Sequence, residues 1–186
     1  MDALELLTSQ HNEVERLFSE YEQLGPGQAE RKKQIARQVI TDLSMHAGVE
    51  EVAFYPTVRE ALPDTEQEIQ EDLEEHERVK QTLSNIQGME PTDPQFDAEF
   101  QQVISDVRHH VNEEENQLFP RVRQGMSDQE LRDLGEAMQE LKSRVPTNPH
   151  PHAPQEPPAN VVLGPVAGML DRVRDAIRQR TGKKTV

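Results

Sequence analysis

Two stretches of the chain follow one pattern: HAGVEEVAFYP at residues 46–56 and HVNEEENQLFP at residues 110–120. Each begins with histidine, has glutamate four and five residues later, and ends with an aromatic residue followed by proline. In a helix of about 3.6 residues per turn, positions i and i+4 lie on one face. Each stretch therefore places an imidazole beside a carboxylate, His46 with Glu50 and His110 with Glu114.

Two further histidines extend the repeat. His11 precedes His76 by 65 residues, and His46 precedes His110 by 64. A nearly constant offset indicates two helical hairpins related by internal pseudo-symmetry. The resulting order, His, His-x3-Glu, His, His-x3-Glu, is typical of a metal site.

The composition limits the possible functions. The chain has 186 residues, a formal net charge of −15 and no cysteine. This length fits one domain with an appended segment. The lack of cysteine excludes disulfides, thiolate metal sites and Fe–S clusters, so His, carboxylate, Tyr or water must hold any metal. The acidic charge argues against nucleic acid as a partner.

The first residues lack the basic region and apolar run of a secretory signal. No apolar stretch approaches the roughly 20 residues needed to span a bilayer. We therefore expect a soluble, cytoplasmic protein without a membrane partner.

Apolar residues recur at steps of three and four along six segments. The predicted helices cover residues 3–24, 28–62, 66–87, 94–124, 128–143 and 163–180. Four long helices with short connections predict an all-α, up-down-up-down four-helix bundle, with the fifth helix on one side or end. Pro56 should kink or end the second helix. Capping boxes are predicted at Thr65 and Ser127, and a cap with a first-turn proline at Asp93-Pro94.

The chain changes character after residue 144. The expected divisions are a bundle at 1–125, an accessory helix at 126–144, an extended proline-rich linker at 145–162 and a basic amphipathic helix at 163–186. The last segment carries a net charge of +4. Through residues 163–180 it could dock on its own acidic bundle, bind a protein partner or lie on an anionic membrane. Its charge favours self-docking, and its lack of Trp and Phe disfavours the membrane.

The four histidines are better explained by a metal than by packing. A single histidine on an apolar stripe is usually a structural core residue. Here each of four helices carries one at its centre, and two also bring an inward glutamate. Buried imidazoles and carboxylates without partners cost several kcal/mol each, which a bound cation removes. Six donors exceed one tetrahedral zinc, and imidazole is a poor ligand for calcium or magnesium. Helix bundles that bury this type of ligand set commonly hold two iron or two manganese ions, and the imidazole content favours iron.

The order, spacing and repeat of these residues resemble the hemerythrin-like (HHE cation-binding) family over residues 1–125. The Pro-His-Pro-His-Ala-Pro linker and the helix after it also resemble hemerythrin-domain proteins of actinobacteria. This resemblance implies a non-haem di-iron centre with an oxo or hydroxo bridge. The ligands carried over by motif are His11, His46, Glu50, His76, His110 and Glu114.

The chain departs from the family pattern on the third helix. Oxygen-carrying hemerythrins have two histidines one turn apart there, whereas this chain has only His76, with Asp72 and Lys80 at the positions on the same face. The resemblance then implies an iron poorer in histidine, completed by water, a carboxylate or Tyr55. That disfavours reversible dioxygen carriage and favours reaction of peroxide, dioxygen or nitric oxide at an open position.

Several functions stay open on this evidence. Catalase-like removal of hydrogen peroxide is the preferred activity. The alternatives are an iron, redox or oxygen sensor that signals through the terminal helix, or a simple dioxygen- or iron-binding protein. An iron reservoir fits poorly because six ligands hold only two ions.

Other polar residues are expected outside the ligand set. Tyr55 lies about 140° from Glu50 on an ideal helix, so core packing is expected, with inward rotation by the neighbouring proline as the alternative. His109 should face solvent or lie beside the ligands, and His150 and His152 should belong to a spacer. Solvated faces are expected for Glu15, Glu51, Glu113 and Glu115.

Overall fold

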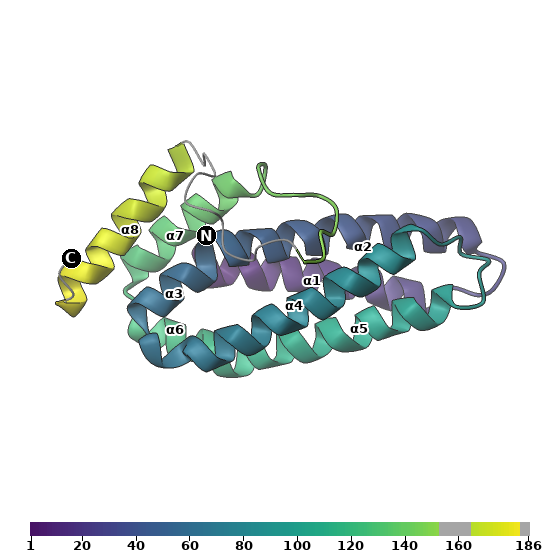
Figure 1. The fold of residues 1–186 in the computed structure, drawn as a ribbon, viewed down its shortest axis with the longest axis horizontal. Helices are drawn as coiled ribbons and strands as arrows, with labels where there is room; N and C mark the ends of the chain where they lie inside the picture. The colour runs from purple at the N-terminus through teal and green to yellow at the C-terminus, as the bar shows by residue number, and fades with distance from the viewer. Residues whose placement is uncertain (153–164, 183–186) are drawn as a thin grey trace.

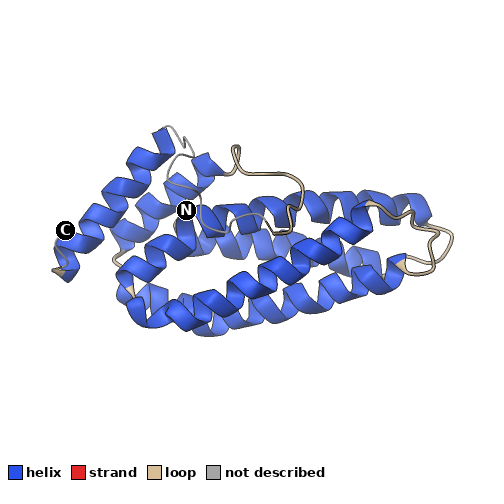
Figure 2. Ribbon diagram, in the orientation of Figure 1, coloured by secondary structure: helices blue, strands red, loops and turns tan. Residues whose placement is uncertain are grey.

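A computed structural model describes residues 1–152 and 165–182, and all regular structure within them is helical, as predicted (Figures 1 and 2). Neighbouring long helices run antiparallel and form an up-down-up-down bundle (Figure 1). These four helices are α1 (Ala3–Glu22), α2 (Ala29–Val49), α4 (Glu66–Gln87) and α5 (Phe96–Glu113). Among the described residues, no helix has both the length and the apolar content needed to cross a membrane.

Two of the predicted helices are each divided in three. The second consists of α2, a π-helical segment η1 (Glu50–Phe54) and α3 (Tyr55–Ala61). The fourth consists of α5, a π-helical segment η3 (Glu114–Leu118) and α6 (Phe119–Gly125). The helical path thus continues past the proline in both, and α3 turns away from the line of α2 (Figure 1).

The two π-helical segments follow from the repeated aromatic-proline pair. Proline has no backbone N–H and its ring crowds the carbonyl four residues back, so the regular hydrogen-bond ladder fails there. The N–H of Tyr55 instead donates to the carbonyl of Glu50, five residues back, and Phe119 does the same to Glu114. One extra residue in a turn delays the following side chains by about 100°. Tyr55 therefore lies about 40° from Glu50 instead of about 140°, and points inward.

The helix starts agree with the predictions in one case of three. Ser127 forms the predicted capping box with Glu130 before α7 (Asp128–Leu141). At Thr65, which ends a short 3₁₀ turn η2 (Pro63–Thr65), the prediction is wrong: its hydroxyl donates to the carbonyl of Leu62. Asp93 accepts from the backbone N–H of Gln95, and α5 starts only at Phe96.

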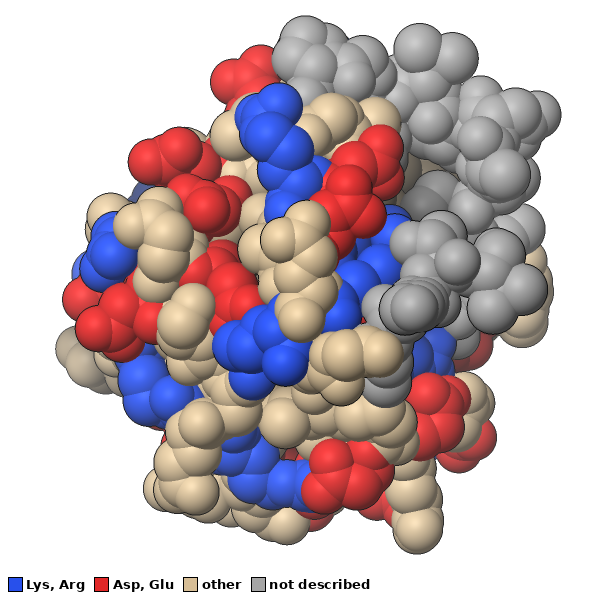
Figure 3. Space-filling view, turned by 90° about the vertical axis from the view of Figure 1, so that its left-hand side faces the viewer, with Lys and Arg blue, Asp and Glu red and all other residues tan. Residues whose placement is uncertain are grey.

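The last helix, α8 (Pro165–Thr181), packs on α3 and α7 at one end of the bundle (Figure 1). Its buried side chains belong to the same apolar cluster as Val58 and Ala61 of α3: Val166, Leu170, Val173 and Ile177. Arg178 pairs with Glu60, and Arg180 pairs with Glu130 at 3.0 Å. Basic and acidic side chains alternate over this end of the molecule (Figure 3). The described part of the helix is thus docked on its own bundle; most of the predicted linker, residues 153–162, lies outside the described residues.

The core consists of two apolar clusters with the predicted metal residues between them. One cluster includes Leu7, and the other includes Val14. His11 lies between these two residues on α1. His46 lies on α2 between Leu43 of the second cluster and Val49 of the first. The helices therefore carry a polar layer across an otherwise apolar interior.

Candidate metal centre

The structure brings the six predicted donors together inside the bundle. The four histidines are 4–6% exposed and the two glutamates are fully buried. They come from four different helices and the two π-helical segments: His11, His46, Glu50, His76, His110 and Glu114. Whether each one binds a metal remains a prediction, but their convergence is a property of the fold.

The donors form two overlapping groups. Ligand atoms of His11, His46, Glu50 and Glu114 all lie within 4.8 Å of one another. Those of Glu50, His76 and His110 do the same. Each group contains two histidines from one hairpin, and Glu50 belongs to both groups.

Each glutamate lies between histidines of different hairpins. Oε2 of Glu50 is 3.1 Å from Nε2 of His46 and 3.4 Å from Nε2 of His76. Oε2 of Glu114 is 3.4 Å from Nε2 of His11 and 3.6 Å from Nε2 of His110. One oxygen of each carboxylate thus lies close to imidazoles of both hairpins.

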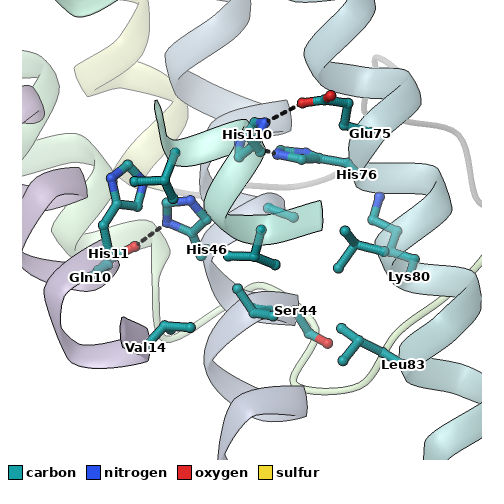
Figure 4. Close-up of a pocket in the computed structure, with 15 residues that line it drawn as sticks. Gln10, His11, Val14, Ser44, His46, Glu75, His76, Lys80, Leu83 and His110 are labelled. Atoms are coloured by element: carbon teal, nitrogen blue, oxygen red, sulfur yellow. Dashed lines mark hydrogen bonds and ion pairs between the residues drawn. The ribbon is translucent and has the colours of Figure 1, made fainter. Parts of the chain in front are cut away.

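Every one of the four imidazoles is held at its other nitrogen. Nδ1 of His11 donates to Glu115 at 2.8 Å, and Nδ1 of His46 donates to the amide oxygen of Gln10 at 2.8 Å. In His76 the same nitrogen donates to Glu51 at 3.0 Å. In His110 it donates to Glu75 at 3.1 Å (Figure 4). In a neutral ring, an Nδ1–H donor leaves a lone pair on Nε2, the atom that faces the centre. All four rings are therefore oriented as metal ligands.

These four acceptors occupy equivalent positions in the two copies of the sequence repeat. They were not among the predicted site residues. Gln10 and Glu75 each precede the first histidine of their hairpin and hold the second histidine of that hairpin. Glu51 and Glu115 each follow the inward glutamate and hold the first histidine of the other hairpin. The sequence feature that could have identified two of these acceptors is the second glutamate of each repeated Glu-Glu pair. These two residues, Glu51 and Glu115, were expected on solvated faces.

That expectation is wrong for Glu51. Its side chain is buried because it accepts from His76 and from Lys80, whose Nζ lies 2.6 and 2.8 Å from its two oxygens. Lys80, one turn after His76, thus anchors the acceptor of that ring. Glu115 is partly exposed although it holds His11.

The other polar residues lie nearer the surface. Glu15 is half-buried and pairs with Arg108. His109 is exposed and contacts Glu75 and Glu113. His150 and His152 are exposed, and His152 contacts Glu77.

The π-helical turn rotates Tyr55 inward and places its hydroxyl beside the cluster. Core packing is therefore not its only role. Its hydroxyl donates to Oε1 of Glu114 at 3.0 Å and lies 3.5 Å from Nε2 of His76. The equivalent residue of the other hairpin is Phe119, whose ring stacks on His11. The hairpins thus differ by one hydroxyl beside the donors.

Burial and mutual repulsion shift the pKa values of these groups strongly. Burial raises the pKa of Glu50 well above its usual value, and Glu114 and Asp72 raise it further. Burial also lowers the pKa of His46. For His110, burial alone would lower the pKa, but the carboxylates of Glu114 and Glu75 raise it to about 9. Burial therefore disfavours the ionised form of Glu50, which a bound cation would favour.

The donor set fits a metal. Among the described residues, no hydrogen-bond partner reaches Nε2 of His11 and His46, either oxygen of Glu50, or Oε2 of Glu114. Buried polar atoms without partners are rare and costly. Nitrogen and oxygen donors without sulfur suit iron, manganese or zinc.

A small cavity adjoins the histidines. It has a volume of about 30 Å³ and is lined by all four imidazoles and by apolar side chains that include Val14, Leu43 and Val107 (Figure 4). A water-sized molecule needs about 10–15 Å³ of such space. The cavity therefore has room for one or two such molecules.

The fold and the site together define a four-helix-bundle protein with a buried cation-binding cluster. Residues 2–122 match the hemerythrin HHE cation-binding domain family, and the chain belongs to that family.

Two relatives and one solved structure are similar to this chain. An uncharacterised hemerythrin-like protein of Schizosaccharomyces pombe is 29% identical over 143 residues, which cover 76% of this chain and 70% of that one. A protein of Nostoc named DNA nickase is also 29% identical, over 145 residues that cover 78% of this chain but only 40% of that one. In fold, the chain resembles the crystal structure of a hemerythrin HHE cation-binding domain-containing protein from Mycobacterium kansasii. That likeness has a TM-score of 0.63 at 20% identity and covers 99% of this chain and 95% of the other.

Proposed function

We propose that the protein is a non-haem di-iron protein that binds and reacts with a small oxidant. His11 and His46 would hold one ion, His76 and His110 the other, and Glu50 and Glu114 would contribute oxygens to both. The observation that carries this proposal is the position of each glutamate oxygen between histidines of different hairpins. When bound, an iron pair supplies one-electron exchange at each ion and a Lewis-acid position for a small ligand.

The size of the adjoining cavity supports a ligand with about two non-hydrogen atoms. Hydrogen peroxide, dioxygen and nitric oxide fit a volume of about 30 Å³, whereas a metabolite does not. Among these we propose hydrogen peroxide, with catalase-like conversion of two peroxide molecules to dioxygen and two waters. The side chains of Val14, Leu43 and Val107 give this cavity apolar walls beside the histidines.

The chain itself supplies a positioned proton. Tyr55 holds its hydroxyl hydrogen on Glu114, at a point also close to His76. Burial raises the pKa of Tyr55 well above its usual value, and Glu114 and Glu50 raise it further, so the phenol stays protonated. We propose that Tyr55 orients Glu114 and holds a proton beside His76, which would bind one of the two ions.

Measurement of oxygen release tests this function. The iron-loaded protein should release dioxygen from hydrogen peroxide in a stopped-flow or electrode assay, and His46→Ala should not. Folding of the variant is checked by circular dichroism. Equal release by the wild type and His46→Ala would reject the proposed activity.

Iron rather than manganese is part of the proposal. Metal analysis of the purified protein should find two iron ions per chain, with the absorption bands of oxo-bridged ferric pairs in the optical spectrum. Two manganese ions in place of iron would refute the metal assignment while leaving the site intact.

A sensor function is the second candidate, and one contact favours it. Helix α3 begins at Tyr55, beside the cluster, and packs along α8. A change at the cluster could therefore alter the contacts of the terminal helix with a partner. Deletion of residues 145–186 should spare peroxide chemistry if the protein is an enzyme, and should abolish partner binding if it is a sensor.

The likeness to the Nostoc protein does not extend this proposal to DNA. The match covers 40% of that protein, and this chain has a net charge of −15. Binding to phosphate backbones needs a basic surface.

A further inference from the structure

Glu75 connects the buried cluster with the surface. Its Oε2 accepts from Nδ1 of His110 inside the bundle, and its Oε1 lies 3.4 Å from Nε2 of His109 outside it. The side chain of Glu75 is only 10% exposed, whereas that of His109 is 61% exposed. One carboxylate therefore faces the protein interior and the solvent at once.

The outer side of Glu75 carries a second set of metal donors. Nε2 of His109 is also 3.6 Å from Glu113, and ligand atoms of Glu75, His109 and Glu113 lie within 4.8 Å of one another. His109 and Glu113 are four residues apart on α5, the spacing that aligns two ligands on one helical face. An imidazole with two carboxylates suits divalent iron, manganese or zinc.

The inner side of Glu75 adjoins a second carboxylate, one oxygen of which has no hydrogen-bond partner among the described residues. Asp72 is 5% exposed, and its Oδ1 lies 3.7 Å from Nδ1 of His110. Its Oδ2 has no hydrogen-bond partner among the described residues. Asp72, Glu75 and His110 form another group with ligand atoms within 4.8 Å of one another. A buried, unpaired carboxylate oxygen is costly unless a cation visits it.

We propose that Glu75, His109 and Glu113 form a surface site for a divalent transition-metal ion, from which Glu75 and Asp72 pass Fe²⁺ to the buried cluster. The proposal rests on the proposed di-iron function, since it describes how that centre is filled. An ion cannot cross apolar side chains without oxygen donors at each step, and the two groups that share Glu75 supply those steps. Acidic surroundings also raise the local concentration of cations.

Arg78 competes for this surface site. Its Nη2 lies 3.3 Å from Oε1 of Glu75, the oxygen that also faces His109. The Arg78 side chain is 60% exposed and can swing into solvent when an ion binds. Removal of Arg78 should therefore favour metal uptake, whereas removal of His109 should oppose it.

The rate of iron uptake tests the proposal. Metal-free protein is mixed anaerobically with Fe²⁺, and the rate at which iron becomes inaccessible to a chromogenic chelator is measured. His109→Ala and Glu113→Gln should each slow uptake about tenfold, because each removes one of the three donors that would hold the ion at the surface, and a raised local concentration of the ion accelerates association by at least that factor. Their final iron content and optical spectrum should equal those of the wild type. Arg78→Ala should accelerate uptake.

His152→Ala is the matched control. His152 is also an exposed histidine paired with a glutamate of α4, Glu77, at 3.1 Å. Its loss should leave the uptake rate unchanged. Wild-type rates in His109→Ala and Glu113→Gln, with two iron ions in each protein, would overturn the uptake route alone. A wild-type protein that never takes up two iron ions would overturn the di-iron function and the route with it.

Discussion

The hairpin α1–α3 and the hairpin α4–α6 supply the same donors but surround them differently. Each gives two histidines and one glutamate, and each gives them at equivalent positions. The acceptors behind the imidazoles are one carboxylate and one amide for His11 and His46, but two carboxylates for His76 and His110. The difference comes from one position of the repeat, Gln10 against Glu75.

The two copies of the repeat are the same at some positions and differ at others. The positions that face the centre are kept, whereas the layer behind them carries single substitutions that adjust each half. A carboxylate acceptor makes an imidazole a stronger ligand than an amide does. We therefore expect two unequal metal positions, with tighter binding at His76 and His110.

The largest expected effect comes from removal of a shared carboxylate. Glu50→Gln keeps the shape of the side chain but removes an oxygen that both positions use, so iron content should fall from two ions to at most one. The unfolding free energy that metal adds, about 4 kcal/mol at 1,000 times the dissociation constant, should be lost with it. Metal analysis and denaturation with and without iron measure both quantities. Glu13→Gln, at an exposed glutamate, is the control, and two iron ions in Glu50→Gln would contradict the shared position.

The second largest effect, on the unfolding free energy, concerns the apolar packing of α8 against α3. Ile177 is fully buried in the same apolar cluster as Val58, so Ile177→Ala should reduce the unfolding free energy by about 2–4 kcal/mol. Iron content should stay at two ions, because the donors themselves are untouched. Chemical denaturation and metal analysis check this, with exposed Gln179→Ala as the control. Lost iron with unchanged stability would instead show that α8 acts on the cluster.

The third effect tests the inequality of the two positions directly. Glu75→Gln should weaken the tighter position about 10–100-fold, and Gln10→Glu should strengthen the weaker one. The exchange of both residues should reverse which hairpin binds its ion more tightly. Equilibrium competition with a chelator of known affinity measures each constant. Identical constants in all of these variants would show that the acceptors only position the rings.

Sequence alone was sufficient for the bundle and for the convergence of the six donors. Apolar stripes and a histidine at the centre of each long helix depend on local periodicity, which the sequence displays. The π-helical turns could not be predicted, because they depend on how the chain resolves the missing N–H of Pro56 and Pro120. For this reason the sequence favoured core packing for Tyr55, with its inward rotation as the alternative.

The acceptors behind the imidazoles were missed for a different reason. Glu51 and Glu115 hold histidines of the opposite hairpin, so their role depends on how the two hairpins face each other. On its own helix, Glu51 looks like a solvent-facing residue. Comparison of the two copies position by position could have detected it, since both copies keep a second glutamate.

The smallest effect concerns the single hydroxyl that distinguishes the hairpins beside the donors. Tyr55→Phe removes the hydrogen bond to Oε1 of Glu114 and should lower the unfolding free energy by about 0.5–1.5 kcal/mol. The equivalent atom of the other half, Oε1 of Glu50, has no hydrogen-bond partner among the described residues. Phe119→Tyr in the same protein should offer that oxygen a donor, if the pseudo-symmetry extends to the aromatic positions.

Denaturation of the metal-free proteins tests this exchange. The double variant Tyr55→Phe/Phe119→Tyr should recover part of the stability that Tyr55→Phe loses, because one donor again serves one buried carboxylate. It should also move the hydroxyl from the side of His76 to the side of His11, so the optical spectra of the iron-loaded single and double variants should differ. A double variant less stable than Tyr55→Phe would mean that the halves are equivalent in their donors but not in the space around them.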